Sequence, residues 1–350
     1  MRCLFNIGHP AEVHLFKNLI HELENRGHEC VVTTIDKEVS ISLLENYGIE
    51  HFVVGRESSS ILMKGVELLF IEYRLLMIAH RFKPDVLIGG VGNAYVAHVG
   101  KLIGKPSIIF DDTEHAKLQH FLTDPFATAI CTPSCYRLDL GSKQVRYDGY
   151  HELAYLHPNY FQPDPELKRS YGMLDDEHII IIRLVSWGAS HDVGHHGLKN
   201  KIKLVEEMSL YGRVIITSEA DLPPELMKYR IAVPPEKLHD LLFHASLCIG
   251  EGATTASECA ILGTHTLYVN TLGLGYISDI SERYGLIVDF SSREFDDAAV
   301  IREAKRILEI PDFKALGKSK ACEIVKDKID VTSFMVSFIE TLTNPEGIPE

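Results

Sequence analysis

The chain lacks any excess of positive charge. It carries 35 Lys and Arg residues against 49 Asp and Glu residues, which gives a formal net charge of −14 at pH 7. Nucleic acids are bound by basic surfaces that neutralise many phosphates, so this balance argues against a nucleic-acid partner. A small anionic ligand stays open, because two phosphates need only a few backbone N–H groups.

The chain also lacks a long uninterrupted apolar run and a framework of paired cysteines. Its most apolar stretch, residues 61–78, is broken by Lys64, Glu67, Glu72 and Arg74, so we expect no transmembrane helix. The first apolar run is too short for a signal peptide. Seven scattered cysteines fit reduced thiols better than disulfides or a zinc site. These absences predict a soluble, cytoplasmic protein.

The rest of the sequence alternates short apolar runs with amphipathic stretches. At 350 residues the chain is too long for one hydrophobic core, and two domains are expected. Strands that alternate with helices predict parallel sheets covered on both faces, an α/β fold. A proline-rich stretch at 157–165 is the expected linker. We therefore predict two Rossmann-like domains, 1–163 and 164–350.

The predicted strands lie in both halves. They are Cys3–Ile7, Glu29–Thr34, His51–Val54, Asp85–Ile88 and Ser107–Phe110 in the first half, and His178–Leu184, Arg213–Thr217, Arg230–Val233, Leu247–Ile249, Thr266–Val269 and Leu286–Asp289 in the second.

The most informative local pattern is IGEGATTASECAILG, which predicts a strand, a tight turn and a helix. Gly250 and Gly252 let the backbone turn sharply and leave room for a ligand. The helix that follows directs its free N–H groups and its dipole at that space, which suits a diphosphate. Thr254 and Thr255 add hydroxyl donors. The structural alternative is a capping box in which Glu258 serves only the backbone of Thr255.

Two more groups of polar residues follow predicted strands. Asp111 and Asp112 come directly after a strand, where crowded carboxylates can act as general acid or base, or can be solvated charges or a helix cap. The loop RLVSWGASHDVGHHG, which begins at Arg183, holds three histidines and one aspartate within six residues. Such a group can bind a metal, but the loop is not obviously helical, and we predict no metal site.

Several motifs together resemble one family. The opening GHPAEVH, the central SWGASHDVG and the glycine turn are similar to DUF354, a family of uncharacterised archaeal and bacterial proteins. The glycine turn also resembles the signature of GT-B glycosyltransferases and of nonhydrolysing UDP-N-acetylglucosamine 2-epimerases. This resemblance, which runs along nearly the whole chain, implies two doubly wound domains that face a central cleft, with the C-terminal helix packed back on the first domain.

The resemblance implies binding roles for individual residues. Gly250, Gly252, Thr254 and Thr255 would hold the diphosphate of a nucleotide-sugar, and Glu258 would hydrogen-bond the ribose hydroxyls.

Other residues of the predicted binding site lie in neighbouring loops. The resemblance places Val233 beside the nucleotide base, although a proline-started helix explains the same segment. Arg183, Ser186 and His191 would contact substrate or phosphate, with a plain loop as the alternative. His9 would bind substrate from the first loop.

The resemblance also suggests the acid/base group. His14 matches a histidine that serves as base in GT-B glycosyltransferases, and a neutral imidazole can accept a proton from an acceptor hydroxyl at pH 7. Asp112 is the other candidate, and a polar helix-start residue is the structural alternative for His14. The chain departs from the epimerases at Gly90-Val91-Gly92-Asn93, where they carry a catalytic aspartate, and at Ser190-His191-Asp192, which replaces an arginine-rich motif.

These features favour a metal-independent glycosyltransferase without a cofactor, which moves a sugar from a UDP-type donor to an unknown acceptor. An epimerase or hydrolase of the nucleotide-sugar is the second hypothesis, and a non-catalytic nucleotide-sugar-binding protein is the third. The apolar pattern of residues 62–78 fits a core helix and leaves peripheral membrane contact open. A homodimer also stays open.

Overall fold

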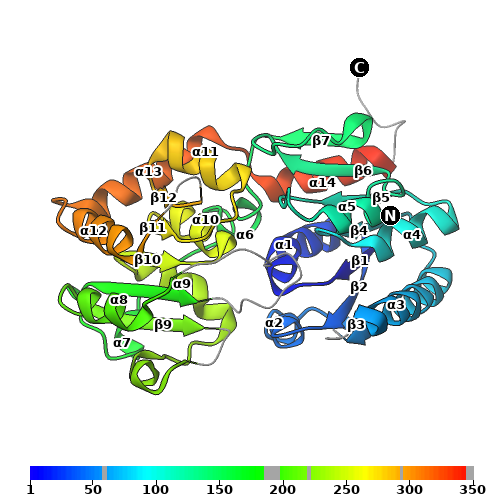
Figure 1. Cartoon of the computed structure of the whole chain (residues 1–350). Coiled ribbons are helices and arrows are strands. Elements are labelled where there is room, and N and C mark those ends of the chain that lie inside the picture. Colours follow the sequence, from blue (N-terminus) through cyan, green and yellow to red (C-terminus); the bar gives the residue numbers. More distant parts are fainter. Residues whose placement is uncertain (57–60, 185–197, 219–221, 292–294, 344–350) are drawn as a thin grey trace. The chain divides into compact units, whose positions relative to one another are not determined.

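A computed structural model describes residues 1–56, 61–184, 198–218, 222–291 and 295–343 of the chain. The chain divides into two compact units (Figure 1). The first unit comprises Met1–Tyr160 and the C-terminal segment that begins at Ile329, and the second comprises Phe161–Lys328. The predicted boundary after residue 163 lies close to the point where the chain leaves the first unit.

The first unit is a seven-stranded parallel sheet in the order β3-β2-β1-β4-β5-β6-β7. Its strands are β1 (Arg2–Ile7), β2 (Glu29–Asp36), β3 (His51–Arg56), β4 (Val86–Gly89), β5 (Ser107–Phe110), β6 (Ala129–Pro133) and β7 (Gln144–Tyr147). Its helices are α1 (Pro10–Asn25), α2 (Ser40–Asn46), α3 (Ile61–Phe82), α4 (Ala94–Ile103), α5 (Lys117–Thr123), the short η1 (Gly141–Lys143), α6 (Leu153–Leu156) and α14 (Val331–Thr343).

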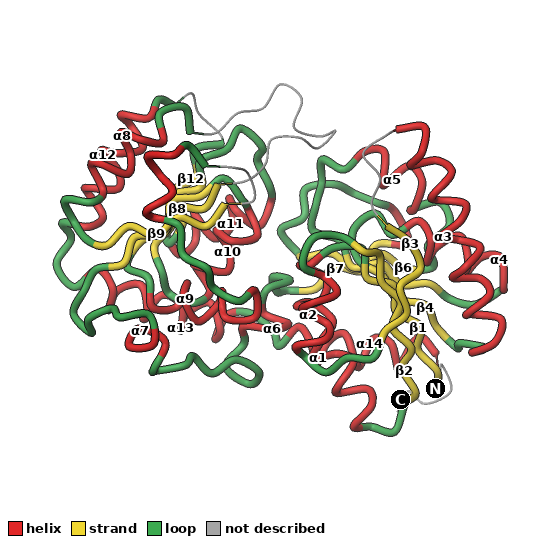
Figure 2. The backbone as a smooth tube through the Cα atoms, turned by 90° about the horizontal axis from the view of Figure 1, so that it is seen from below, coloured by secondary structure: helices red, strands yellow, loops and turns green. Residues whose placement is uncertain are grey.

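Helices cover both faces of this sheet, because successive strand side chains point to opposite sides. Leu4 of β1 belongs to a core cluster with Leu75 of α3 and Val96 of α4. The next residue, Phe5, packs on the other face, where its ring centroid lies 5.7 Å from that of Phe16 of α1. Figure 2 shows α3 and α4 on one side of the strands and α1 and α14 on the other.

The last helix, α14, is part of the first unit although the second unit precedes it in sequence. Its apolar face is fully buried and consists of Val331, Met335, Val336 and Ile339.

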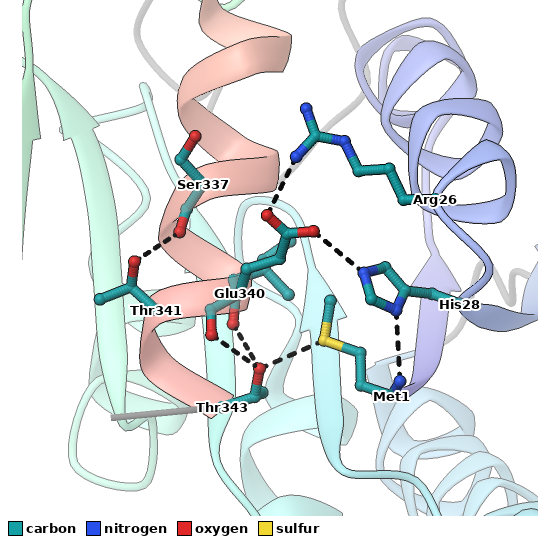
Figure 3. Close-up of polar contacts among 8 residues, drawn as sticks. Met1, Arg26, His28, Ser337, Glu340, Thr341 and Thr343 are labelled. Carbon is teal, nitrogen blue, oxygen red and sulfur yellow. Dashed lines mark hydrogen bonds and ion pairs between the residues drawn. The ribbon is translucent and has the colours of Figure 1, made fainter. Parts of the chain in front are cut away.

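Polar contacts at the end of α14 join it to the start of the chain (Figure 3). Glu340 accepts a hydrogen bond from Arg26 at 3.0 Å and lies 3.0 Å from Nε2 of His28. The other ring nitrogen of His28 lies 3.2 Å from the N-terminal amine of Met1. Thr343 Oγ1 lies 3.2 Å from Sδ of Met1, so the last described residue of α14 contacts the first residue of the chain.

The second unit is a five-stranded parallel sheet in the order β12-β11-β10-β8-β9. Its strands are β8 (Ile179–Leu184), β9 (Arg213–Ser218), β10 (Leu247–Gly250), β11 (His265–Tyr268) and β12 (Ile287–Asp289). Its helices are α7 (Leu167–Ser170), α8 (Lys201–Met208), η2 (Pro224–Tyr229), η3 (Pro235–Lys237), α9 (Leu238–His244), α10 (Ala253–Ile261), α11 (Gly275–Tyr284), α12 (Asp297–Leu308) and α13 (Phe313–Asp327).

Strand β8 shows why this sheet is parallel and covered on both faces. It opens with four consecutive isoleucines, all fully buried, and a strand that is apolar on both sides needs a layer on each. On one face, α8 and α12 supply Leu204 and Val300 to the core. On the other, α10 packs against α11 and α13.

The prediction of an α/β fold with two doubly wound parallel sheets is confirmed. Two strands of the first sheet, β6 and β7, were not predicted. The predicted strand Arg230–Val233 is wrong, because this segment lies between two short 3₁₀ helices and makes only an isolated bridge from Arg230 to Ile216. Among the described helices, none combines the length and the apolar character required to cross a bilayer.

Candidate functional site

In each sheet the strand order reverses at one point. The reversal lies between β1 and β4 in the first unit and between β8 and β10 in the second. Ligands of doubly wound sheets bind outside the carboxyl ends of the strands at this point. Most of the residues predicted from sequence follow strands at or next to this point: His9 and His14 follow β1, Asp112 follows β5, and the glycine turn follows β10. Each unit therefore has one candidate surface.

In the second unit, the candidate surface is the turn between β10 and α10. Gly250 ends β10 beside Arg183 of β8, and Gly252 is the N-cap of α10, which begins at Ala253. As a glycine, this N-cap has no side chain that could cap the first turn. Gly252 and Ala253 are partly exposed, so the first amide groups and the positive end of the helix dipole are available to an anion.

Buried hydrogen bonds fix the shape of this turn. Glu251 Oε1 accepts the backbone N–H of Leu198 at 3.0 Å, and Asn270 donates from its side chain to the carbonyl of Glu251 at 2.8 Å. The backbone N–H of Glu251 donates to the carbonyl of Arg183 at 3.1 Å. Sequence analysis missed Glu251 and Asn270, although an acid between two glycines after an apolar strand was a usable signal.

Glu258 lies within α10 and is buried. Its Oε1 lies 2.9 Å from Nε2 of His239, which is also buried and meets the ring of Phe161 edge-on. The capping box on Thr255 is wrong, because α10 begins at Ala253 and Thr255 therefore lies inside the helix. The ribose-binding role of Glu258 stays a prediction.

The other predicted binding residues differ in their surroundings. Thr254 and Thr255 occupy the first turn of α10, where Thr254 is partly exposed and Thr255 is buried. Val233 is half-buried in the segment between η2 and η3. Ser186 and His191 lie outside the described residues. Their roles stay predictions.

In the first unit, the candidate surface is built around Asp112, directly after β5. Its Oδ2 lies 3.1 Å from Nδ1 of His151, and its Oδ1 accepts the hydroxyl of Thr113 at 2.9 Å. Burial alone would raise the pKa of Asp112, but the charge and hydrogen bond of His151 hold it below its usual value. Burial would lower the pKa of His151, and Asp112 raises it instead. The two side chains therefore form a carboxylate–imidazolium pair.

Glu12 of α1 approaches the same strand ends. Its Oε2 accepts the backbone N–H of Gly8 at 2.7 Å. Burial raises the pKa of Glu12 to about 7, against the opposing effects of this hydrogen bond, Lys37 and His151. A Cβ atom on Gly90 would lie 2.5 Å from the Glu12 carboxyl carbon, so a side chain at this position would have to displace the carboxyl group of Glu12. Glu12 thus titrates near neutral pH.

Asp111 is a second buried carboxyl group with a high pKa. Burial raises its pKa to about 7, although Nδ1 of His120 lies 3.4 Å from its Oδ2. The hydrogen bond to Asp124 raises the pKa of His120 to about 9. The first unit therefore holds carboxyl groups of contrasting acidity. At neutral pH, Asp112 is ionised, whereas Asp111 and Glu12 are each about half protonated.

The two histidines predicted in the first loop have different environments. His9 is the exposed N-cap of α1, where its Nδ1 accepts the backbone N–H of Ala11 at 3.2 Å. His14 is buried; its Nδ1 lies 3.2 Å from the hydroxyl of Tyr47 and its ring lies 5.4 Å from that of Tyr155. The structure pairs Asp112 with His151, and the roles of His9 and His14 stay predictions.

Sequence analysis missed His151 and Glu12. His151 follows β7, a strand that was not predicted, so nothing marked it as a residue at the edge of the sheet. Glu12 sits three positions after the N-cap His9, where an acid normally caps its own helix. Within the part of the chain that the structure describes, no group of three or more His, Cys, Asp and Glu side chains is arranged to hold a metal ion.

Solved structures share this fold over the whole chain. The UDP-N-acetylglucosamine 2-epimerase of Neisseria meningitidis, solved with UDP-N-acetylglucosamine, has a TM-score of 0.67 and 12% identity, over 98% of this chain and 99% of that chain. The glycosyltransferase VinC, solved with dTDP, has a TM-score of 0.63 and 13% identity, over 99% and 100%. The chain therefore has the GT-B fold of glycosyltransferases and epimerases.

Sequence comparison gives the family. An uncharacterized protein of Methanocaldococcus jannaschii is 25% identical over 339 residues, which cover 92% of this chain and 98% of the relative. The family described as "Protein of unknown function (DUF354)" matches residues 2–334. As its motifs predict, the chain belongs to the DUF354 family.

Proposed function

We propose that the chain is a nucleotide-sugar-dependent glycosyltransferase that moves a sugar from a UDP-type donor to an acceptor hydroxyl. The observation that carries this proposal is the start of α10 on a glycine N-cap, which lies where the strand order of the second unit reverses. Proteins of the same fold support the ligand class, since one was solved with UDP-N-acetylglucosamine and another with dTDP.

The first turn of α10 is suited to stabilising a leaving group. When the bond between the sugar and the diphosphate breaks, negative charge develops on the diphosphate. Amide groups at Ala253, Thr254 and Thr255 are held in place by the helix and need no reorganisation to meet that charge. Removing one such preorganised donor typically slows a reaction by about 10²–10³-fold.

The proposed general base is Asp112 in the first unit. Its lowered pKa keeps it ionised at neutral pH, and His151 balances its charge. In the proposed step, Asp112 takes the proton of the acceptor hydroxyl, whose oxygen attacks the anomeric carbon. The bond from that carbon to the diphosphate breaks, and UDP leaves with the electron pair. His14, predicted from the resemblance, is the alternative base.

Binding of nucleotides tests the proposal. A thermal-shift screen would compare UDP, dTDP, GDP, their sugar conjugates and free sugars. A ligand present at 100 times its Kd stabilises the native state by about 2.7 kcal/mol, or roughly 5–10 °C for a domain of this size. No shift with any nucleoside diphosphate at millimolar concentration would overturn the proposal.

Variants at Asp112 separate binding from chemistry. Asp112→Asn should bind UDP as the wild type does, while turnover falls by about 10²–10⁴-fold because the base is lost. His14→Gln is the matched comparison, since it removes the alternative base. If His14→Gln loses activity and Asp112→Asn keeps it, the assignment of the base is wrong.

One observation favours a second function, epimerisation or hydrolysis of the nucleotide-sugar itself. Such reactions need a proton donor as well as a base, and burial raises the pKa values of Glu12 and Asp111 to about 7 on the same unit as the ionised Asp112. Incubation of UDP-N-acetylglucosamine without an acceptor distinguishes the two. An epimer or free UDP supports this second function, and an unchanged donor supports transfer. If the protein binds the nucleotide-sugar but forms no product with any acceptor tested, it is a non-catalytic binding protein.

A further inference from the structure

The outer face of α3 carries a stripe of large apolar side chains. Val66, Leu69, Phe70, Tyr73 and Met77 are exposed by 61, 66, 49, 60 and 39%, respectively. Contiguous exposed apolar surface of this kind marks an interaction site on a soluble protein. We call these five residues the α3 stripe.

The α3 stripe is not the face that holds α3 to its own sheet. Ile71, Leu75 and Ala79 lie on the opposite side of the helix and are buried in two core clusters of the first unit. Figure 2 shows α3 on the outside of the strands, side by side with α4. The sequence pattern of this segment is therefore explained only in part by a core helix, because α3 is apolar on two faces.

The spacing of the α3 stripe fits a second helix. Val66, Phe70, Tyr73 and Met77 follow one another at steps of four, three and four, the heptad spacing of a helix–helix seam. This set is also symmetric about its centre. In an antiparallel pair of identical helices, Val66 of each copy would lie opposite Met77 of the other, and Phe70 of each copy opposite Tyr73 of the other. We propose that α3 pairs with the α3 helix of a second copy, in antiparallel orientation, to form a homodimer with twofold symmetry.

Charges beside the α3 stripe agree with this register. Glu67 and Arg74 lie on the same side of the seam, where the guanidinium of Arg74 lies over the ring of Phe70, 4.2 Å from its centroid, and donates to the carbonyl of Val54 at 3.4 Å. In the antiparallel pair, Glu67 of each copy comes within reach of this guanidinium of the other. An anionic membrane surface is a poorer match, because Glu67 borders the apolar face and the net charge of the chain is −14.

The area of this surface suits a stable dimer. Leu118 and Phe121 of α5 are exposed by 69 and 74%, and α4 packs against both α5 and α3. His98 of α4 connects the two helices, since its ring nitrogens contact Glu72 of α3 and the carbonyl of Leu122 of α5. With about 100 Å² from each of the five side chains of the α3 stripe on both copies, the pair would bury roughly 1,000 Å², the size at which a specific interface begins.

Oligomeric state in solution tests the proposal. Sedimentation velocity between about 1 and 100 µM should show a dimer for the full chain. Phe70→Glu should weaken the dimer at least 100-fold while the monomer keeps the circular dichroism spectrum of the folded chain, because this side chain is half exposed in the monomer. Leu210→Glu, at a side chain exposed by 79% in the second unit, is the matched control and should stay dimeric.

A monomeric wild type at every concentration, or a Phe70→Glu variant that dimerises like the wild type, overturns the proposal. A monomer that sediments with vesicles of phosphatidylglycerol and phosphatidylcholine, and loses this binding in Phe70→Glu, assigns the α3 stripe to a membrane and also overturns it.

Cysteine cross-linking tests the antiparallel register, in a background where the exposed Cys322 is replaced by serine. The double variant Val66→Cys/Met77→Cys should form disulfide-linked dimers under mild oxidation. Neither single variant should, because in this register identical positions lie eleven residues apart, or roughly 16 Å along the helices. Cross-linking of each single variant alone would indicate parallel pairing and overturn the proposed register.

Discussion

A single buried carboxyl group, Glu12, connects the candidate site to the stability of the first unit. Burial raises its pKa from 4.5 to about 7, so between these values the folded protein binds more protons than the unfolded chain does. Stability contributed by this group is therefore greatest at low pH and is lost as the pH rises through about 7.

Glu12→Gln removes this titration and keeps the shape of the side chain. We expect the variant to be within about 1 kcal/mol of the wild type at pH 5 and more stable by up to about 3 kcal/mol at pH 8.5. Urea unfolding at both pH values measures the difference. If the free energies of unfolding of the variant and the wild type differ by the same amount at pH 5 and at pH 8.5, Glu12 has an ordinary pKa in the folded protein.

At the same scale, sequence alone could identify Asp112 but not its partner. Asp112 follows an apolar run, and the end of a buried strand is a local feature that can be read from the sequence. His151 lies 39 residues further on (151 − 112), beyond two strands whose apolar runs are short. The pair depends on β5, β6 and β7 lying side by side, which is a tertiary fact and leaves no local pattern.

At the scale of elements, the strand–turn–helix around α10 was predictable and the start of its helix was not. Threonine and glutamate at capping-box spacing favour a start at Thr255. In the structure, bonds of Glu251 to Leu198 and to Asn270 hold the turn so that the helix begins at Ala253. Contacts between distant parts of the chain therefore override the local capping preference.

The wrongly predicted strand Arg230–Val233 has a different cause. Its apolar residues suit a strand, but prolines stand close by on both sides, at 223–224 and 234–235. Proline cannot donate to a strand ladder and is pre-set for the first turn of a helix. As a result, one 3₁₀ helix forms before the segment and one after it, and the segment contributes a single bridge to the sheet.

The start of α10 gives a test that separates binding from stability. Ala253→Asp places a negative charge in the first helical turn, where it should stabilise the helix by about 0.3–1 kcal/mol. The same charge should repel a diphosphate and weaken UDP binding at least tenfold, about 1.4 kcal/mol. Calorimetric titration with UDP and thermal unfolding measure the two effects.

Ala253→Asn is the matched control, because it has nearly the same shape without the charge and should bind UDP like the wild type. If Ala253→Asp binds UDP undiminished while its Tm rises, the helix start is intact but does not hold the diphosphate.

At the scale of the whole molecule, alternation of strands and helices was enough to predict two doubly wound sheets. The pattern of α14 was not enough to assign it to one of them, because an amphipathic helix fits either sheet. Its place in the first unit was expected from the family resemblance alone. Physically, it follows from a buried apolar face and from the contacts of Glu340 with Arg26 and His28.

The discontinuous first unit makes a prediction about fragments of the chain. Removing α14 uncovers Val331, Met335, Val336 and Ile339, which are fully buried. At about 1.5–3 kcal/mol for each side chain, the loss is roughly 6–12 kcal/mol, comparable with the whole stability of a domain. We therefore expect residues 1–160 alone to lack a cooperative thermal transition, while residues 161–328 alone retain one.

A circular permutant should restore the first unit. Thr343 contacts Met1, so a short linker can join residue 343 to residue 1 in a chain that begins at residue 329 and ends at residue 160. Circular dichroism during heating should show a cooperative transition for this permutant and none for residues 1–160. Because the two chains differ by little more than α14, equal transitions in both would mean that the first sheet and its other helices are stable without the C-terminal helix.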